Sequence, residues 1–208
     1  MAVAALLAAC GGESSSDSNE RAGTYRLHVS EATFPTDQQL GQTSLLRLGV
    51  RNSGEETVPN LTVTISIAGK EGAASALPFG FHDPAPGLAQ PDRPVWVLAA
   101  GYPKRGDSKD PGGATTSNPR TFAFGPLKPG ETSDAVWKLV AVKAGDYTLE
   151  YGVGAGLASD IKAKTKGDVA PGGSFVVDVS SEMPDTEVTP SGEVVEIESG
   201  SGQGGKGE

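Results

Sequence analysis

The chain of 208 residues has one cysteine and two histidines, and aromatic residues make up only 6% of it. A single cysteine excludes a disulfide within the chain, and two histidines leave few ligands for a transition metal. Lysine and arginine number 17 against 26 acidic residues, for a net charge of −9. Binding to nucleic acid depends on clustered cations. We therefore expect no nucleic-acid partner, no metal and no cofactor.

Long apolar segments are also lacking, since no run approaches the roughly 18 apolar residues that a membrane-spanning helix needs. The sequence instead holds 29 glycines and 15 prolines, and its apolar fraction is 37%. These values predict a compact core with many turns and some unstructured chain. At roughly 100–200 residues per domain, the length accommodates one main domain with appendages.

The N-terminus changes abruptly from apolar to polar at Cys10. The string Leu7-Ala8-Ala9-Cys10 resembles the lipobox of bacterial lipoproteins, and this resemblance implies cleavage before Cys10 and lipidation of its thiol. Residues 1–9 are then the remnant of a signal peptide, and the membrane is a partner through the lipid anchor. Two or more acyl chains hold a protein stably on a membrane.

Residues 10–23 comprise the lipidated cysteine and a small, polar, acidic stretch that is typical of a flexible linker. Nothing basic precedes Cys10, and nine residues are few for a secretory signal, so we expect translation to begin upstream of Met1. The alternative is a short apolar N-terminus with an incidental cysteine. The lipobox interpretation predicts an extracytoplasmic protein, lipid-anchored in a bacterial cell envelope.

Apolar residues between positions 24 and 180 recur mostly with period two, which is the signature of half-buried strands. Leu61, Val63, Ile65 and Ile67 alternate with polar residues in the clearest example. No window of eleven or more residues carries a helical apolar stripe. The sequence predicts an all-β fold, an antiparallel immunoglobulin-like β-sandwich of about 7–9 strands. The strands are expected at 25–29, 46–50, 61–67, 95–98, 121–124, 136–142, 147–153, 161–165 and 174–180.

Two sets of residues resemble the CARDB-type immunoglobulin-like modules of bacteria. The first set is Leu48-Gly-Val-Arg-Asn52-Ser-Gly54 followed by the alternating segment 58–65, and the second is Leu127-Lys-Pro-Gly-Glu131, Trp137 and Ala144-Gly-Asp-Tyr147. In this pattern Asn52 and Gly54 form a turn and tolerate left-handed conformations. The resemblance implies an adhesion or assembly module, and it carries no catalytic residues onto this chain.

Two segments fall outside the regular strand pattern. Residues 69–120 form a long insertion rich in proline and glycine, in which only the region around 94–102 is expected to form a strand. Such long loops in a compact domain are usually functional or disordered. Residues 181–208 form an acidic tail with a Gly/Ser-rich end, which we expect to be disordered.

Aromatic residues of the insertion are the candidate binding residues. Phe79, Phe81, Trp96 and Tyr102 could form a platform for a peptide or a glycan, or they could instead pin the long loop to the sandwich. His82 beside Asp83 is the better of the two histidines for chemistry. A packing role is favoured for His82 because no nucleophile turn accompanies it. His28 is predicted to face solvent.

The pattern of residues leads to three functional hypotheses. The first is a non-catalytic cell-surface lipoprotein that acts in adhesion, binding or structural interaction with a protein or glycan ligand. The second is a ligand-binding accessory lipoprotein of a transporter or envelope enzyme, which predicts a pocket beneath the insertion. The third is an enzyme, and it requires His82 and Asp83 to meet a distant residue. We expect the first and do not expect an enzyme.

Overall fold

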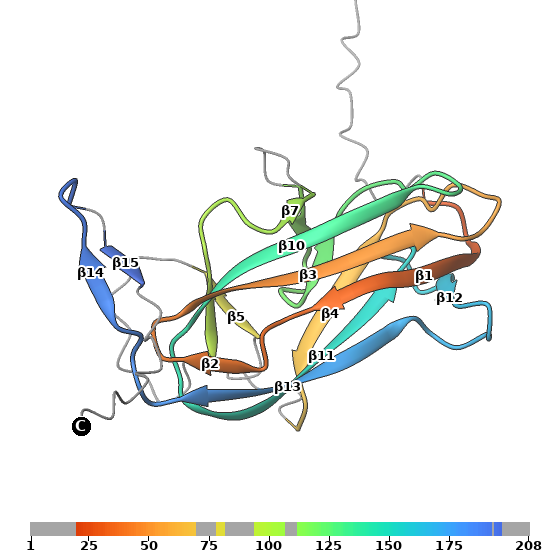
Figure 1. Ribbon diagram of the computed structural model, residues 1–208. Helices are drawn as coiled ribbons and strands as arrows, with labels where there is room; N and C mark the ends of the chain where they lie inside the picture. The colour runs from red at the N-terminus through yellow and green to blue at the C-terminus, as the bar shows by residue number, and fades with distance from the viewer. Residues whose placement is uncertain (1–19, 70–77, 82–93, 107–111, 193, 197–208) are drawn as a thin grey trace, which may run out of the picture.

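The computed structural model describes residues 20–69, 78–81, 94–106, 112–192 and 194–196. The described residues form a two-layered β-sandwich without helices, together with a separate two-stranded hairpin (Figure 1). The all-β sandwich predicted from the sequence is confirmed. The described part of the chain contains no helix that is both long enough and apolar enough to span a membrane.

The first sheet has seven strands in the order β12-β1-β3-β10-β6-β5, and β7 pairs with β10 beside this path. Its strands are β1 (Gly23–Thr33), β3 (Thr43–Asn52), β5 (Phe79–Phe81), β6 (Trp96–Leu98), β7 (Lys104–Arg105), β10 (Thr132–Ala141) and β12 (Ile161–Lys164). The longest pairings are antiparallel, between β10 and β3 and between β1 and β3. A β-bulge between Val29 and Glu31 shifts the register of β1 against β3.

The second sheet has six strands in the order β2-β13-β11-β4-β9-β8. Its strands are β2 (Asp37–Gln39), β4 (Thr62–Ile67), β8 (Ala114–Thr115), β9 (Thr121–Ala123), β11 (Gly145–Gly154) and β13 (Gly172–Ser180). β11 runs between β13 and β4 in unbroken antiparallel register. This continuity gives the outer face of the sheet regular rows of side chains.

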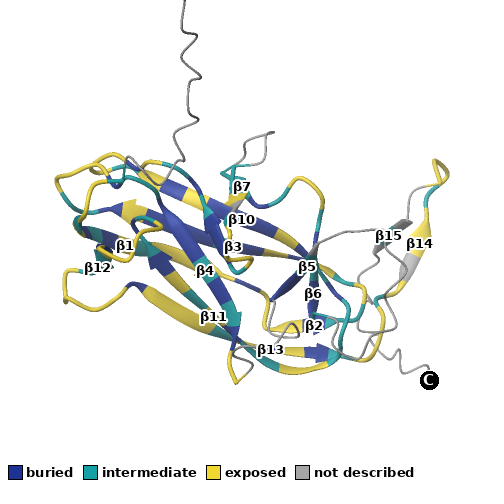
Figure 2. Cartoon of the chain, turned by 180° about the vertical axis from the view of Figure 1, so that it is seen from behind, coloured by how far each residue is buried: buried dark blue, intermediate teal, exposed yellow. Residues whose placement is uncertain are grey.

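The core fills the space between the two sheets, and Figure 2 shows the buried residues following the strands of both layers. Leu46, Leu48 and Val50 of β3 are wholly buried. Val63 and Ile65 of β4 are buried from the opposite sheet, as their alternation predicts. The interior is therefore built by period-two patterning, and burial of this apolar surface makes the largest favourable contribution to the stability of the fold.

Each of the nine expected strands is present, with bounds shifted by a few residues. Four shorter strands of the two sheets, β2, β5, β7 and β8, were not expected. The sandwich is also not purely antiparallel, because β12 pairs in parallel with β1, β2 with β13, and β5 with β6. These three parallel pairings all involve a strand at a sheet edge.

The segment predicted as an insertion contributes to the sandwich itself. β6 pairs with β10, and β7 pairs with the same strand further along. β8 pairs with β9, which follows the segment, and so extends the other sheet. The segment 69–120 was expected to hold one strand, around 94–102, whereas four short strands of its described part, β5 to β8, pair within the two sheets.

The turn after β3 also differs from the expectation. Neither Asn52 nor Gly54 has a positive φ. Asn52 is instead wholly buried, and its Nδ2 donates to the carbonyls of Glu56 at 2.8 Å and Leu127 at 2.9 Å. Its Oδ1 accepts from the amide of Gly54 at 3.0 Å. Asn52 acts as a buried hydrogen-bonding centre, whereas the reversal at Gly130 does use a positive φ, of 75°.

Both terminal segments are more ordered than expected where the structure describes them. Glu20, within the predicted linker, bonds to the loop at 157–158, and β1 begins at Gly23. In the predicted disordered tail, β14 (Thr186–Val188) and β15 (Val194–Glu196) form a hairpin. Figures 1 and 2 both place this hairpin beyond the end of β13, outside the two layers.

Candidate functional site

An open trough of about 1020 Å³ lies on the outer face of the six-stranded sheet. The register of the paired strands determines which residues form its floor. Thr64 of β4 lies between Gly152 of β11 and Thr121 of β9. The next row joins Gly154, Thr62 and Ala123 in the same way. These residues point away from the core because they alternate with buried neighbours. The floor is therefore flat and made of small side chains.

Hydroxyl and amide groups line the trough. The Oγ1 atoms of Thr64 and Thr121 lie 2.8 Å apart and share a hydrogen bond. The turn at Thr116, Ser117 and Asn118 forms part of one side. In this turn the hydroxyl of Thr116 donates to the Asn118 carbonyl at 2.9 Å. The lining thus offers groups that both donate and accept hydrogen bonds.

Asn60 ties two walls of the trough together. Its Nδ2 donates to Oε1 of Glu20 at 3.1 Å, and its Oδ1 accepts from the amide of Gly125 at 3.0 Å. The other carboxylate oxygen of Glu20 accepts from the amides of Leu157 at 2.7 Å and Ala158 at 3.4 Å. The walls at residues 125 and 157 are therefore held in place before any ligand arrives, which lowers the entropic cost of binding.

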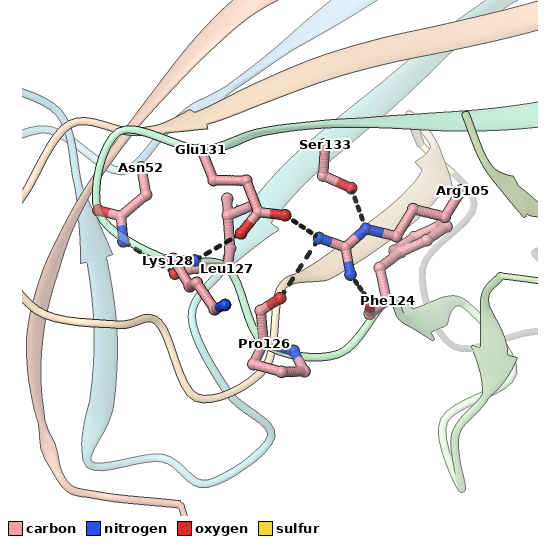
Figure 3. Close-up of polar contacts among 8 residues, drawn as sticks. All are labelled: Asn52, Arg105, Phe124, Pro126, Leu127, Lys128, Glu131 and Ser133. Carbon is pink, nitrogen blue, oxygen red and sulfur yellow. Dashed lines mark hydrogen bonds and ion pairs between the residues drawn. The ribbon is translucent and has the colours of Figure 1, made fainter. Parts of the chain in front are cut away.

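Arg105 of β7 fixes the loop behind one wall (Figure 3). Its Nε donates to Oγ of Ser133 at 2.9 Å, and its Nη2 lies 3.0 Å from Oε1 of Glu131. The same guanidinium reaches the carbonyls of Phe124 at 3.5 Å and Pro126 at 3.4 Å. A planar guanidinium suits such a set of acceptors. Because Pro126 lines the trough, the Arg105 network supports its shape.

Among the described residues that line the trough, Glu20 carries the one formal charge. Both carboxylate oxygens of Glu20 already accept hydrogen bonds from other residues of the protein. No pair of nucleophile and base lies along the described lining, and the described residues contain no group of three or more His, Cys, Asp and Glu side chains placed to hold a metal. The arrangement is suited to binding an uncharged ligand by hydrogen bonds.

Two of the predicted binding residues lie in the core, and the expectation of an exposed aromatic platform is wrong for them. Trp96 has no exposed surface. Its ring packs edge-on against the rings of Phe34 and Tyr147, with 5.7 Å between ring centroids in each pair. Phe79 is 2% exposed and lies beside Phe122. Both side chains pin the segment to the sandwich, which was the alternative interpretation. They also fill space beneath the segment 69–120, where the second functional hypothesis predicts a pocket.

The structure describes only some of the other predicted residues. Tyr102 is half-buried, and Nζ of Lys104 lies 5.0 Å from its ring centroid. Phe81 pairs through its backbone with Leu98, and its side chain is not described. His82 and Cys10 lie outside the described residues. His28 is exposed, as predicted. Of the predicted site residues whose side chains are described, Phe79 and Trp96 are buried and only Tyr102 is partly exposed.

Sequence analysis missed the residues of the trough. Thr62 and Thr64 alternate with the apolar residues of the clearest predicted strand, as solvent-facing residues do, and nothing in the residue type of Asn60 or Thr121 indicates a site. Glycines also recur at positions 152, 154 and 156. Packing does explain Gly154, where an added Cβ would meet Oγ1 of Thr62, and Gly156, where it would lie 2.6 Å from Cδ1 of Ile161. Gly152 in mid-strand was the one signal that could have indicated the site.

Comparison with known proteins gives similarity to solved structures only. No protein-family model and no curated protein matches the sequence. A CARDB domain from Pyrococcus furiosus, in complex with di-metal ions, is 14% identical with a TM-score of 0.43, covering 76% of this chain and 96% of its own. Part of native alpha-2-macroglobulin from Escherichia coli is 14% identical with a TM-score of 0.41, covering 81% of this chain and 21% of its own. The PapD-like domain of human CEP192 is 14% identical with a TM-score of 0.34, and the match covers 89% of this chain and 99% of that domain.

Proposed function

We propose that the protein is a non-catalytic interaction module, held on the outside of a bacterial membrane by lipid on Cys10, and that it binds its ligand in the trough. The observation that carries this proposal is the trough itself, a large open depression with both polar and apolar lining groups, whose walls are fixed by Asn60, Glu20 and Arg105. Ligand sites are typically concave and largely formed in advance. The absence of an acid–base pair along its described lining favours binding over catalysis.

The position of Glu20 links the trough to the proposed anchor. Glu20 lines the trough, and it follows Cys10 by ten positions along the chain. Even at full extension, ten residues span at most about 35 Å. A lipid on Cys10 would therefore keep the trough close to the bilayer, and its ligand would be a component of the cell envelope near the membrane.

Intact mass of the native protein extracted from membranes tests the anchor. We expect a mass increased by acyl chains with Cys10 as the new N-terminus, and we expect Cys10→Ser to move the protein into the soluble extracytoplasmic fraction. An unmodified mass, or an unchanged membrane fraction for Cys10→Ser, contradicts the lipid anchor.

Site-specific photo-crosslinking in intact cells tests the trough. A benzoylphenylalanine in place of Ser117 lies at the rim, whereas the same group in place of Val176 lies on the exposed face of β13, outside the trough. We expect an adduct from position 117 that position 176 does not form. Equal or absent adducts at the two positions contradict the trough as the binding site.

A further inference from the structure

Gly152 lies at the open floor of the trough, and the fold gives no reason for a glycine there. A Cβ at this position would have no atom within 4 Å, and its φ is not in the left-handed region. The strand pairing through Gly152 is regular on both sides, without a bulge. A glycine inside a strand costs roughly 0.5–1 kcal/mol relative to alanine. Among the reasons for a glycine inside a strand, the open space above Gly152 matches a ligand that approaches the main chain closely.

Neighbouring glycines do have structural reasons, so this argument is specific to position 152. A Cβ on Gly172 would lie 2.6 Å from the carbonyl oxygen of Tyr151, and one on Gly173 would lie 2.7 Å from the Tyr151 hydroxyl. Gly154 is restricted by Thr62. Gly125 also lines the trough with open space around it, but its φ of 79° favours glycine, and Gly152 has no such conformational reason.

The hydrogen-bonding surface above Gly152 consists of side chains. The main chains of β4 and β11 are paired on both sides, with β9, with each other and with β13. A peptide could not add to the floor as a further strand, because such binding needs an unpaired edge. The groups that remain are hydroxyls such as those of Thr64 and Thr121, which reverse donor and acceptor roles freely. A ligand rich in hydroxyls matches this property.

The size and the charge of the trough further restrict the class of ligand that it could bind. About 1020 Å³ is at the upper end of the range for a drug-sized ligand, so the space suits a chain of several units. An anionic ligand would lose hydration without finding a cation in the lining, and the one lining carboxylate described, Glu20, already accepts hydrogen bonds from neutral groups. The occupant is therefore extended and uncharged.

We infer that the trough binds a neutral glycan chain, with the flat face of one sugar ring on the main chain at Gly152 and its hydroxyls on Thr64 and Thr121. This inference rests on the proposed function, because it names the ligand class for the same trough. A side chain at position 152 would lift the ring from the floor, while a hydroxyl lost from position 64 or 121 would remove a ligand contact.

Titration of the full chain with neutral oligosaccharides tests the inference, using Cys10→Ser to remove the acylation site. The probes are hexamers of glucose and of N-acetylglucosamine, followed by an array of neutral glycans. We expect binding by this protein, and a loss of at least about tenfold in affinity for Gly152→Val. Ser174→Val is the matched control, since Ser174 is exposed on β13 and does not line the trough. It should bind normally.

Folding and binding are separated by a second variant. Thr64→Val combined with Thr121→Val removes both partners of one hydrogen bond and keeps their shape, which leaves stability nearly unchanged. We expect native circular dichroism and at least about fivefold weaker glycan binding. Unchanged glycan binding in this variant and in Gly152→Val overturns the inference.

The remaining outcomes distinguish the inference from the proposed function. If no neutral glycan binds while the crosslink from position 117 still forms with an envelope protein, the glycan is wrong and the trough remains a binding site. Binding of a neutral peptide rich in Ser and Thr, with no glycan binding, overturns the inference in the same way. If neither glycan binding nor the crosslink is found, both the inference and the proposed site fail.

Discussion

The indole nitrogen of Trp96 donates a hydrogen bond of 2.8 Å to Oε1 of Gln38, and both side chains are buried. Trp96 belongs to the seven-stranded sheet and Gln38 to the six-stranded sheet, so this bond joins the two layers. Gln38 in turn donates from Nε2 to the carbonyl of Pro35 at 2.8 Å. A residue considered for an exposed binding platform is thus part of the link between the sheets.

Trp96→Phe should destabilise the protein more than Trp137→Phe does. Both indoles are wholly buried, and each contacts two aromatic rings edge-on. Nε1 of Trp137, however, has no hydrogen-bond partner among the described residues. Trp96→Phe strands a buried acceptor on Gln38, which costs roughly 1–3 kcal/mol in addition to the lost packing. Urea unfolding of both variants measures this difference, and equal losses would contradict the role of the bond.

Asn52→Ala should lower the free energy of unfolding by about 2–3 kcal/mol, because three main-chain groups lose their hydrogen bonds to a wholly buried side chain. The groups are the carbonyls of Glu56 and Leu127 and the amide of Gly54. Asn118→Ala is the control, since Asn118 makes a similar bond to the amide of Arg120 in an exposed turn. Chemical denaturation should give a loss below about 1 kcal/mol for the control. A similar loss for both variants would show that burial of Asn52 is not the cause.

Arg105→Lys should loosen β7 while it changes global stability little. The ion pair with Glu131 is partly exposed, and such pairs contribute about 0–1 kcal/mol. A lysine cannot replace the several bonds of the guanidinium. We expect exchange of the Gly106 amide, which bonds to the Asp134 carbonyl, to quicken by about tenfold. Arg51→Lys at an exposed position of β3 should leave that rate unchanged, and protection that persists in Arg105→Lys would contradict the network.

The pKa of Asp168 should depend on Arg26. The hydrogen bond and the charge of Arg26, at 2.6 Å, hold the pKa of this carboxyl below its ordinary value, with a smaller contribution from Lys164. Because the folded-state pKa is the lower one, the stabilisation is present above the ordinary pKa and is lost as the pH falls through the folded-state value. Asp168 is exposed, so the effect on stability should be small.

Arg26→Gln should raise the Asp168 pKa toward its ordinary value, measured by carboxyl chemical shifts during an acid titration. Lys162→Gln is the control, since Lys162 is the exposed neighbour on β12 and does not contribute to the shift. An unchanged Asp168 titration in Arg26→Gln would contradict the assignment of the shift to Arg26.

The sequence allowed the long strands to be predicted because each carries several alternating apolar residues, as in β4. Short strands such as β5 and β7 span two or three residues and contain no period to detect. Trp137 could be placed in the core because apolar neighbours alternate around it. Trp96 lies among prolines and glycines, and its burial depends on Gln38 and Phe34, which are distant in sequence.

The trough could not be predicted from local pattern because its parts come from separate segments. Asn60, Thr121 and Gly152 are brought together by the pairing of β9, β4 and β11. Outward-facing threonines on a strand are normally exposed to water, so their residue type carries no sign of a site. What distinguishes them is the set of walls at Glu20 and residues 116–118, and these appear only once the chain is folded.

The way in which β1 enters its sheet determines how the domain bears mechanical load. Gly23 to Arg26 pair in parallel with β12, and the rest of β1 pairs with β3. Tension applied along this strand from the N-terminal side acts along both ladders, so their hydrogen bonds are loaded in shear rather than peeled apart one at a time. Under the proposed anchor at Cys10, a pull from the membrane would reach the domain through this doubly paired strand.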